Sequence, residues 1–320
     1  MVGKFLIDGE DAFVLYGVFV KQGGFNGILS FPAFKKLDEN EWAEEDGSEV
    51  DTSDAVLDKH TFDISFNCTD YWKLLNFVSL ISDGSYHEYE FKEAGCKKRM
   101  RLTDNPNKKI YRNMESITLS FSEDEPMSGY EYAAPVLDGG VPVQEGYEFD
   151  GVPTSNYGIY FVEGTLDEIL KAPTVKQNLS VNIKKNPGII YDGSEVFFKK
   201  KEVSLKCWMR CNSPETMYRN LCALVHDLSK KTLRTDEDGY KYEDALRSLY
   251  IDSIVEEYPC HYGGLNVTKY ELLSGGRAWV EFDLKLVFTS FRVNGLEILL
   301  ATEADELVIT EDNEYYIDLS

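Results

Sequence analysis

The sequence predicts a mainly β protein of two tandem, similar β-sandwich or half-barrel modules, each with one α-helix and a long arm. Three observations predict it: a pattern that occurs twice at the same spacing, short runs that alternate apolar and polar residues, and a high aromatic content. The 320 residues include 20 Tyr and 18 Phe, which favour strands. The chain is long enough for two domains that each bury a core.

The repeated pattern is marked by the pentapeptide Asp-Gly-Ser-Glu-Val, which occurs at Asp46–Val50 and again at Asp192–Val196. Each copy follows a Tyr-Gly-aliphatic-aromatic segment, and a Pro stands fifteen positions after that Gly in both copies. An alternating strand begins 45 positions after the same Gly in both copies, at Phe62 and at Val203. Self-similarity over this length predicts a duplicated module.

The pattern divides the chain into four parts. We expect copy one at 1–128, a linker at 129–146, copy two at 147–290, and a C-terminal tail or small hairpin at 291–320. The linker assignment rests on Pro135, Gly139-Gly140 and Pro142, which interrupt regular structure.

Copy one is expected to begin with a strand and a tight turn at Asp8-Gly9, followed by a strand that starts near Tyr16. The arm follows at 35–59, and an alternating strand then begins at Phe62. A helix is predicted from Asp70 onwards with Thr69 as its N-cap, and the copy closes with an alternating strand at 117–121.

Copy two repeats this order, with its turn at Asp150-Gly151 and its arm at 175–201. Its helix is predicted with Ser213 as N-cap and Pro214 at the first helical position, a strong start signal. The final strand, 282–288, alternates strictly. Three tryptophans in helix or strand patterns are expected in the core: Trp72, Trp208 and Trp279.

The two arms carry opposite charges. Between Asp38 and Asp58 the first arm has ten acidic residues and neither Lys nor Arg, whereas the second arm is rich in Lys. A solvated loop is the simpler reading, and pairing of an acidic arm with a basic arm or a neighbouring chain is the alternative. The candidate assembly contacts are Trp42, Glu44, Glu45, Asp46, Lys184, Lys185, Lys199 and Lys200.

No motif indicates catalysis. The four histidines lack partners at catalytic or metal-ligand spacing, and neither a glycine-rich phosphate loop nor Gly-x-Ser-x-Gly is present. Cys207 and Cys211 have the only metal-like cysteine spacing, and we expect them to be buried thiols. The sequence therefore predicts a non-enzymatic protein without a cofactor or a bound metal.

The formal net charge of −23 argues against sequence-specific binding of DNA or RNA, because an acidic surface repels phosphate. The N-terminal apolar run is interrupted by Asp8, Glu10 and Asp11, and no run approaches the ~18 apolar residues that span a bilayer. We therefore expect a soluble protein that is made in the cytoplasm and does not bind a membrane.

The first copy also resembles a known family. The pattern from Tyr16-Gly17 through Glu41-Trp42 and Phe62–Phe66, closing with Phe121–Pro126, resembles tail proteins of bacteriophages and prophages of gut Bacteroidetes that are similar to distal-tail and tail-tube proteins. The resemblance implies a structural protein of the virion tail or baseplate hub, made in a bacterial cytoplasm. It supplies no catalytic residues.

The resemblance further implies assembly into a ring around the tail channel, through which DNA passes without specific binding. Partners would be copies of the chain and other tail proteins. Because the chain carries two modules, three chains would give a trimer with pseudo-sixfold symmetry, and a hexamer and a monomer are the alternatives. The alternative hypothesis is that the chain is a two-domain β-sandwich protein that binds carbohydrate or a cell surface. Such a protein would present exposed aromatic residues around a concave site.

Overall fold

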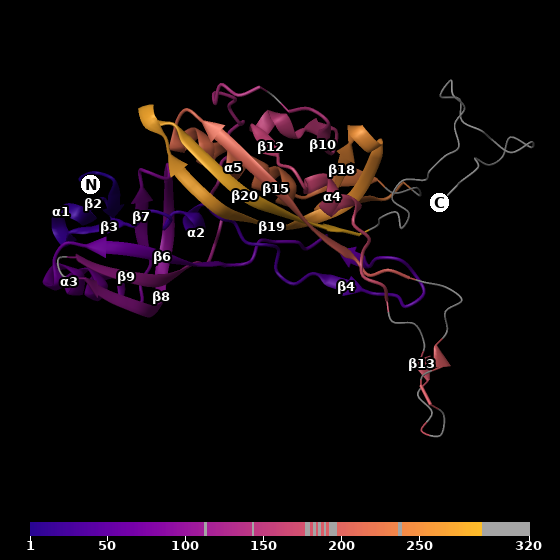
Figure 1. Ribbon diagram of the computed structural model, residues 1–320, viewed down its shortest axis with the longest axis horizontal. Coiled ribbons are helices and arrows are strands. Elements are labelled where there is room, and N and C mark those ends of the chain that lie inside the picture. Colours follow the sequence, from indigo (N-terminus) through magenta and orange to yellow (C-terminus); the bar gives the residue numbers. More distant parts are fainter. Residues whose placement is uncertain are drawn as a thin grey trace, which may run out of the picture.

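The computed structural model describes residues 1–111, 114–142, 144–176, 180–181, 184, 187–188, 190–191, 197–235 and 239–289. Two antiparallel seven-stranded sheets stand side by side along the molecule (Figure 1). We name the region of the first sheet module one (residues 5–123) and that of the second module two (residues 147–288). The expected mainly β fold with flanking helices is confirmed. The second pentapeptide, Lys185 and the tail at 291–320 lie outside the described residues.

The strands of the first sheet are, in sheet order, β2 (Glu10–Asp11), β1 (Phe5–Ile7), β7 (His87–Phe91), β8 (Cys96–Tyr111), β9 (Met114–Glu123), β6 (His60–Cys68) and β3 (Val18–Val20). Those of the second are β11 (Val152–Pro153), β10 (Tyr147–Phe149), β18 (Leu246–Ile251), β19 (Glu256–Leu272), β20 (Ala278–Phe288), β15 (Lys201–Cys211) and β12 (Ile159–Phe161). The two orders are the same when the strands are matched by their place along each module.

Individual strand registers also match. Val18 pairs with Cys68 in module one, and Ile159 pairs with Met209 in module two, so both members of the second pair are numbered 141 higher. The turn after the first strand places its Asp in the left-handed region in both modules, with φ of 50° at Asp8 and 49° at Asp150. A glycine follows each, as two-residue hairpin turns favour.

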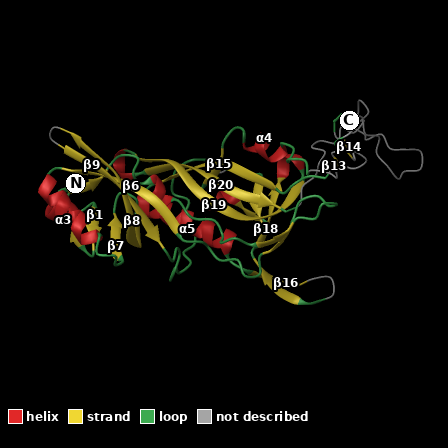
Figure 2. Ribbon diagram, turned by 90° about the horizontal axis from the view of Figure 1, so that it is seen from below, coloured by secondary structure: helices red, strands yellow, loops and turns green. Residues whose placement is uncertain are grey.

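Helices flank the sheets at α1 (Ala12–Tyr16), α2 (Asn26–Leu29), α3 (Tyr71–Ile81), α4 (Thr165–Leu170) and α5 (Pro214–Ser229), with short 3₁₀ turns at η1 (Thr154–Tyr157), η2 (Asp252–Ile254) and η3 (Ser274–Gly276). Two-stranded hairpins are formed by β4 (Asp38–Asn40) with β5 (Glu49–Asp51), β13 (Ser180–Val181) with β14 (Ile190–Tyr191), and β16 (Thr232–Thr235) with β17 (Lys241–Asp244). Figure 2 shows the β16 hairpin projecting from module two.

The start of α3 corrects one prediction. Its N-cap is Asp70, not Thr69, because the Asp70 carboxylate accepts hydrogen bonds from the amides of Trp72 and Lys73. The amide of Thr69 instead donates to the carbonyl of Gly17. The predicted start of α5 is confirmed: Ser213 caps it and Pro214 is its first residue.

The core is continuous through both modules and includes all six cysteines, which are free and buried. Burial raises the pKa of Cys96, Cys211 and Cys222 to about 12, so these thiols are inert at neutral pH. The expectation that Trp72, Trp208 and Trp279 are core residues is wrong. Trp72 has an exposed fraction of 73%, and Trp208 and Trp279 are half-buried and lie outside the core cluster. Among the described residues, no helix is both long and apolar enough to span a membrane.

Candidate assembly surface

Each arm leaves its module through the same backbone pattern. In arm one (residues 35–59), the amide of Lys35 donates to the carbonyl of Val56, and the amide of Asp58 donates to that of Ala33. In arm two (residues 175–201), the matching bonds run from Lys176 to Phe197 and from Lys199 to Thr174. Every residue number is again 141 higher, so the spacing predicted from sequence extends into the roots of the arms.

Most residues of arm one are exposed, but the arm docks on the root of arm two. The ammonium group of Lys176 lies 2.7 Å from the carbonyl oxygens of Trp42 and Glu45 and 2.8 Å from that of Gly47. Lys176 is buried, with an exposed fraction of 5%. An ammonium has three protons to donate, and three charge-assisted hydrogen bonds offset its removal from water.

The first pentapeptide supplies further contacts in this docking. The carboxylate of Asp46 accepts from the amide of Phe198 at 2.8 Å, and the amide of Gly47 donates to the carbonyl of Phe198 at 2.9 Å. Gly47 has a φ of 74°, a conformation that glycine adopts without a steric penalty. The pentapeptide is therefore a turn that fits one particular strand edge.

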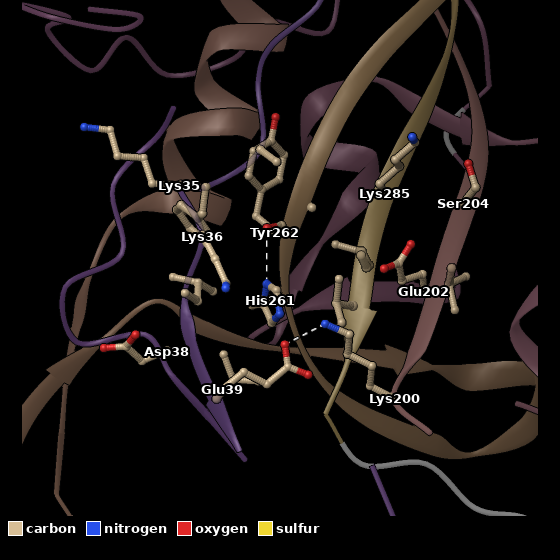
Figure 3. A pocket seen from close by; sticks show the side chains of 18 of the residues that line it. Lys35, Lys36, Asp38, Glu39, Lys200, Glu202, Ser204, His261, Tyr262 and Lys285 are labelled. Atoms are coloured by element: carbon tan, nitrogen blue, oxygen red, sulfur yellow. Dashed lines mark hydrogen bonds and ion pairs between the residues drawn. The ribbon is translucent and has the colours of Figure 1, made fainter. Parts of the chain in front are cut away.

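An ion pair between described residues joins the two arms directly. Lys200 lies 2.6 Å from the carboxylate of Glu39 at the margin of a cavity of about 910 Å³ (Figure 3). Burial by itself would raise the pKa of Glu39, but the hydrogen bond and charge of Lys200 lower it below its ordinary value. Burial lowers the pKa of His261, which lines the same cavity. Both acidic and basic side chains line this cavity, among them Asp38, Glu202 and Lys285.

The predicted contact residues are thus partly brought together. Asp46 and Lys200 join the arms through their side chains, whereas Trp42 and Glu45 contribute backbone carbonyls. The Trp42 ring is 54% exposed, and its N–H donates to Glu49 at 3.3 Å. Glu44, Lys184 and Lys199 are exposed. All these contacts lie within one chain, and contacts between chains stay a prediction.

Sequence reasoning missed Lys176, which holds the arm most directly. A signal was present: Lys176 stands 141 positions after Lys35, at the same place in the arm root. The spacing alone could not show that the second lysine is buried under the first arm.

A second surface joins the modules themselves. Phe31, just after α2, pairs with Leu265 of β19 through two backbone hydrogen bonds of 2.8 and 3.1 Å. Ser30 accepts from the amide of Val267 at 2.8 Å, and Asn26 donates to the carbonyl of Thr268 at 2.8 Å. Strand pairing of this kind protects a sheet edge while it fixes the relative position of two domains.

The turn between β7 and β8 completes this module interface. A Cβ on Gly95 would lie 2.3 Å from backbone atoms of Pro214 and Glu215 at the start of α5, so only glycine fits there. The hydroxyl of Tyr270 donates to the carbonyl of Glu93 in the same turn. In the module interface, therefore, backbone atoms of the two modules are in direct contact, and side chains add further hydrogen bonds.

The linker lies over module two. The side-chain amide of Asn220 on α5 accepts from the amide of Val136 at 2.8 Å and donates to its carbonyl at 2.9 Å. The amide of Asn212 donates to Asp138 at 2.9 Å. Asn220 is fully buried, so these bonds satisfy a polar group that would otherwise be costly.

The remaining polar clusters support packing. Lys98, which is buried, lies 2.5 Å from Glu123 and 5.4 Å from the centre of the Phe31 ring. Burial would raise the pKa of Glu123, and the neighbouring His60 and Lys98 lower it instead. Within the part of the chain that the structure describes, no group of three or more His, Cys, Asp or Glu side chains is arranged to hold a metal ion.

Comparisons with known proteins give a distant likeness to a solved structure. No protein-family model matches the chain, and no curated protein matches it significantly. Among solved structures it is similar to SPP1 Dit (gp 19.1), described as a paradigm of the hub adsorption apparatus in phages that infect Gram-positive bacteria. The identity is 10%, the TM-score is 0.31, and the match covers 90% of this chain and 99% of that one.

Proposed function

We propose that the chain is a non-enzymatic structural protein of a phage or prophage tail, at the distal tail or baseplate hub. In this proposal, copies of the chain and other tail proteins assemble into a ring around the tail channel. The single observation that carries the proposal is the construction of the molecule: two sheets of the same strand order, joined by a strand-paired interface and an arm. Because two similar modules already pack side by side in one chain, further copies of the chain could pack in the same way.

We further propose that residues 1–128 and 147–290 derive from one duplicated module, with residues 129–146 as the linker. Support comes from the matched strand orders and from the arm roots, whose hydrogen bonds differ by a constant 141 positions. Unrelated domains would have no reason to share both a topology and a spacing. Three such chains would supply six modules and a pseudo-sixfold ring, and six chains would supply twelve.

The charge of the chain fits a channel component. A formal net charge of −23 repels phosphate, so DNA would pass the protein without being held. The proposed role requires no catalytic group, and the clusters described above act in packing and docking.

The carbohydrate-binding alternative would require aromatic side chains gathered around one concave site. Among the described residues, the most exposed aromatic side chains belong to Trp42, Trp72 and Tyr240, with exposed fractions of 54%, 73% and 74%. They lie on three different segments: arm one, α3 and the end of the β16 hairpin. This distribution favours contacts along the length of the molecule over one sugar-binding site.

The test is the solution mass of the full chain over a range of concentrations, combined with negative-stain images. The proposal expects ring-shaped particles whose mass equals three or six chains. A chain that stays monomeric at the highest concentration, both alone and with purified tail components of its own phage, would overturn it.

A further inference from the structure

The module interface covers the first turns of α5, and this cover has no counterpart on α3. Pro214 and Glu215 meet Gly95 of module one, and the ring of Tyr218 stacks on Phe31 with centroids 6.2 Å apart. These three positions on α5 are the first, second and fifth after the N-cap. They form the face of α5 that turns towards module one.

The same three positions on α3 carry hydrophobic residues that are exposed. Counted from the N-cap Asp70, they are Tyr71, Trp72 and Leu75, with exposed fractions of 41%, 73% and 39%. The apolar surface continues onto the adjacent helix α1, where Val14 and Leu15 are 53% and 45% exposed. An apolar patch of this kind on a soluble protein marks a site of contact.

Module two has an uncovered counterpart of the turn that covers α5. The turn Lys92–Gly95 joins β7 to β8, and the turn Asp252–Val255 joins β18 to β19 at the same register. The fourth residue is left-handed in both, with φ of 66° at Gly95 and 53° at Val255. Gly95 is pressed against α5, whereas the side chain of Val255 is 76% exposed. A β-branched residue rarely adopts this backbone conformation, and the side chain of Val255 lies largely in solvent.

The segment after the short second helix shows the same contrast. Ser30 and Phe31, which follow α2, are buried against β19 with exposed fractions of 6% and 4%. Their counterparts Lys171 and Ala172, which follow α4 at 141 positions higher, are exposed. Leu265, the partner of Phe31, follows a bulge in β19, and β8 has a bulge at the matching place.

The uncovered surfaces lie at opposite ends of the molecule. Figure 1 places α1 and α3 at the end of module one far from module two, and α4 and β18 at the far end of module two. One chain therefore cannot bring them together, and a second copy can. Exposed apolar side chains stand on both surfaces: Trp72 and Leu75 on α3, and Val255 on the turn. The other exposed residues of the turn, Asp252 and Ser253, are polar.

We propose that the α1–α3 end of one chain binds the α4–β18 end of a second copy. In this contact, module two of one chain meets module one of the next in the way that module one meets module two within a chain. Val255 of one chain lies against Trp72 and Leu75 of the next, and the segment that begins at Lys171 lies along β8. The contact is head-to-tail, so it leads to a ring if the rotation closes. This inference rests on the assembly in the proposed function and names the surface that carries it.

The proposed contact between chains (the outer contact) differs from the module interface within one chain (the inner contact) in the space at the turn. At Gly95 the inner contact leaves no space for a Cβ atom, while Val255 brings a branched side chain to the equivalent place. The outer surfaces therefore stand further apart at this point. The large Trp72 ring, in the position of Glu215, fills the added space.

A mixed disulfide experiment tests the pairing. Full-length chain carrying Trp72→Cys and a differently tagged chain carrying Val255→Cys are mixed and oxidised gently. The native cysteines are buried in the described structure, so background crosslinking is low. We expect the mixed 72–255 product to exceed both same-site products by about tenfold, because a head-to-tail contact places unlike surfaces together. A chain carrying Leu233→Cys, at an exposed position of 62% on the β16 hairpin, is the matched control for Val255→Cys.

The outcomes separate this inference from the proposed function. Rings without an excess of the 72–255 product would overturn the inference and leave the tail ring standing. A dominant 72–72 product would also overturn it, because it indicates a twofold contact. The 72–255 product in open filaments would support the inference and contradict the ring.

A second measurement does not depend on disulfides. We expect Val255→Asp to weaken self-association about tenfold or more, as the loss of a central apolar contact does. Leu233→Asp, the control, leaves association unchanged. Equal effects of the two substitutions, or none from either, would overturn the inference.

Discussion

Module one and module two have the same strand order, and yet their long helices lie in different surroundings. The turn Lys92–Gly95 and the linker cover α5, whereas the equivalent face of α3, with Trp72 and Leu75, is exposed. The sheets cannot explain this difference, because they match strand for strand. It shows that the surface of each module is adapted to what lies next to it: another part of the same chain for α5, and in our proposal another copy for α3.

The largest effect is expected at the inner contact, from Gly95→Ala. An added Cβ would press on the backbone of α5 and would also strain a left-handed residue, at a combined cost of about 2–5 kcal/mol in the free energy of unfolding. Chemical denaturation of the full chain measures it. Gly84→Ala is the matched control, because Gly84 is left-handed in open space. If both variants lose the same stability, the module interface contributes less than its geometry indicates.

The docked arm gives the next effect. Lys176→Met removes the charge that three carbonyls of arm one surround, and we expect arm docking to weaken by about 1.5–3 kcal/mol. Limited proteolysis within 38–58 should become faster. Lys199→Met, which changes an exposed lysine next to Lys200 of the ion pair with Glu39, should leave the cleavage rate unchanged. A rate that rises equally in both variants would mean that general charge, and not the Lys176 contact, holds the arm.

The helix caps test the match between α3 and α5. Asp70→Ala and Ser213→Ala each remove a side chain that accepts from amides in the first turn, and each should cost about 1 kcal/mol of unfolding free energy. Thr69→Ala should cost less, because Thr69 is not the cap of α3. Thermal or chemical denaturation measures all three. A larger loss from Thr69→Ala than from Asp70→Ala would contradict the assignment.

The smallest effect concerns pH and separates the modules. Asp8 is paired with His87 at 2.7 Å, while its counterpart Asp150 is paired with Arg247 at 3.5 Å. Burial alone would lower the pKa of His87, but hydrogen bonds to Asp8 and Asp83 raise it above 6.5. Because the pKa of His87 is higher in the folded state, the protonated His87 side chain stabilises the fold. That contribution is complete below pH 6.5 and is lost as the pH rises through the folded-state pKa.

We therefore expect wild-type protein to be more stable than His87→Gln at about pH 6 and to lose that advantage by about pH 8.5. Comparison with the variant cancels the opposite contributions of His60 and His261, whose pKa values burial lowers. Arg247 stays charged throughout this range, so its pair with Asp150 has no such dependence. An advantage that is constant with pH would show that the contact of His87 is not ionic.

The sequence predicted that the two halves share a strand order, because strand pairing requires regular spacing and the 45 positions from Gly17 to Phe62 recur from Gly158 to Val203. It could not predict the surroundings of each module. Trp72 stands in an apolar helical pattern, and such a pattern does not show whether a side chain packs in the core of its own chain or against a second molecule. The docking of arm one on Lys176 joins residues more than 120 positions apart, and local patterns carry no information on such contacts. The cap of α3 was misplaced by one residue because Thr69 and Asp70 are both good N-caps.

The central claim is that copies of the chain join by repeating the contact that joins its own modules. A cryo-electron microscopy reconstruction of the assembled full chain, calculated without imposed symmetry, tests it most directly. The account predicts a ring in which the β18–β19 turn of each chain lies against α3 of the next. An assembly in which α1 and α3 face solvent, or in which two chains meet through the same surface, would contradict it.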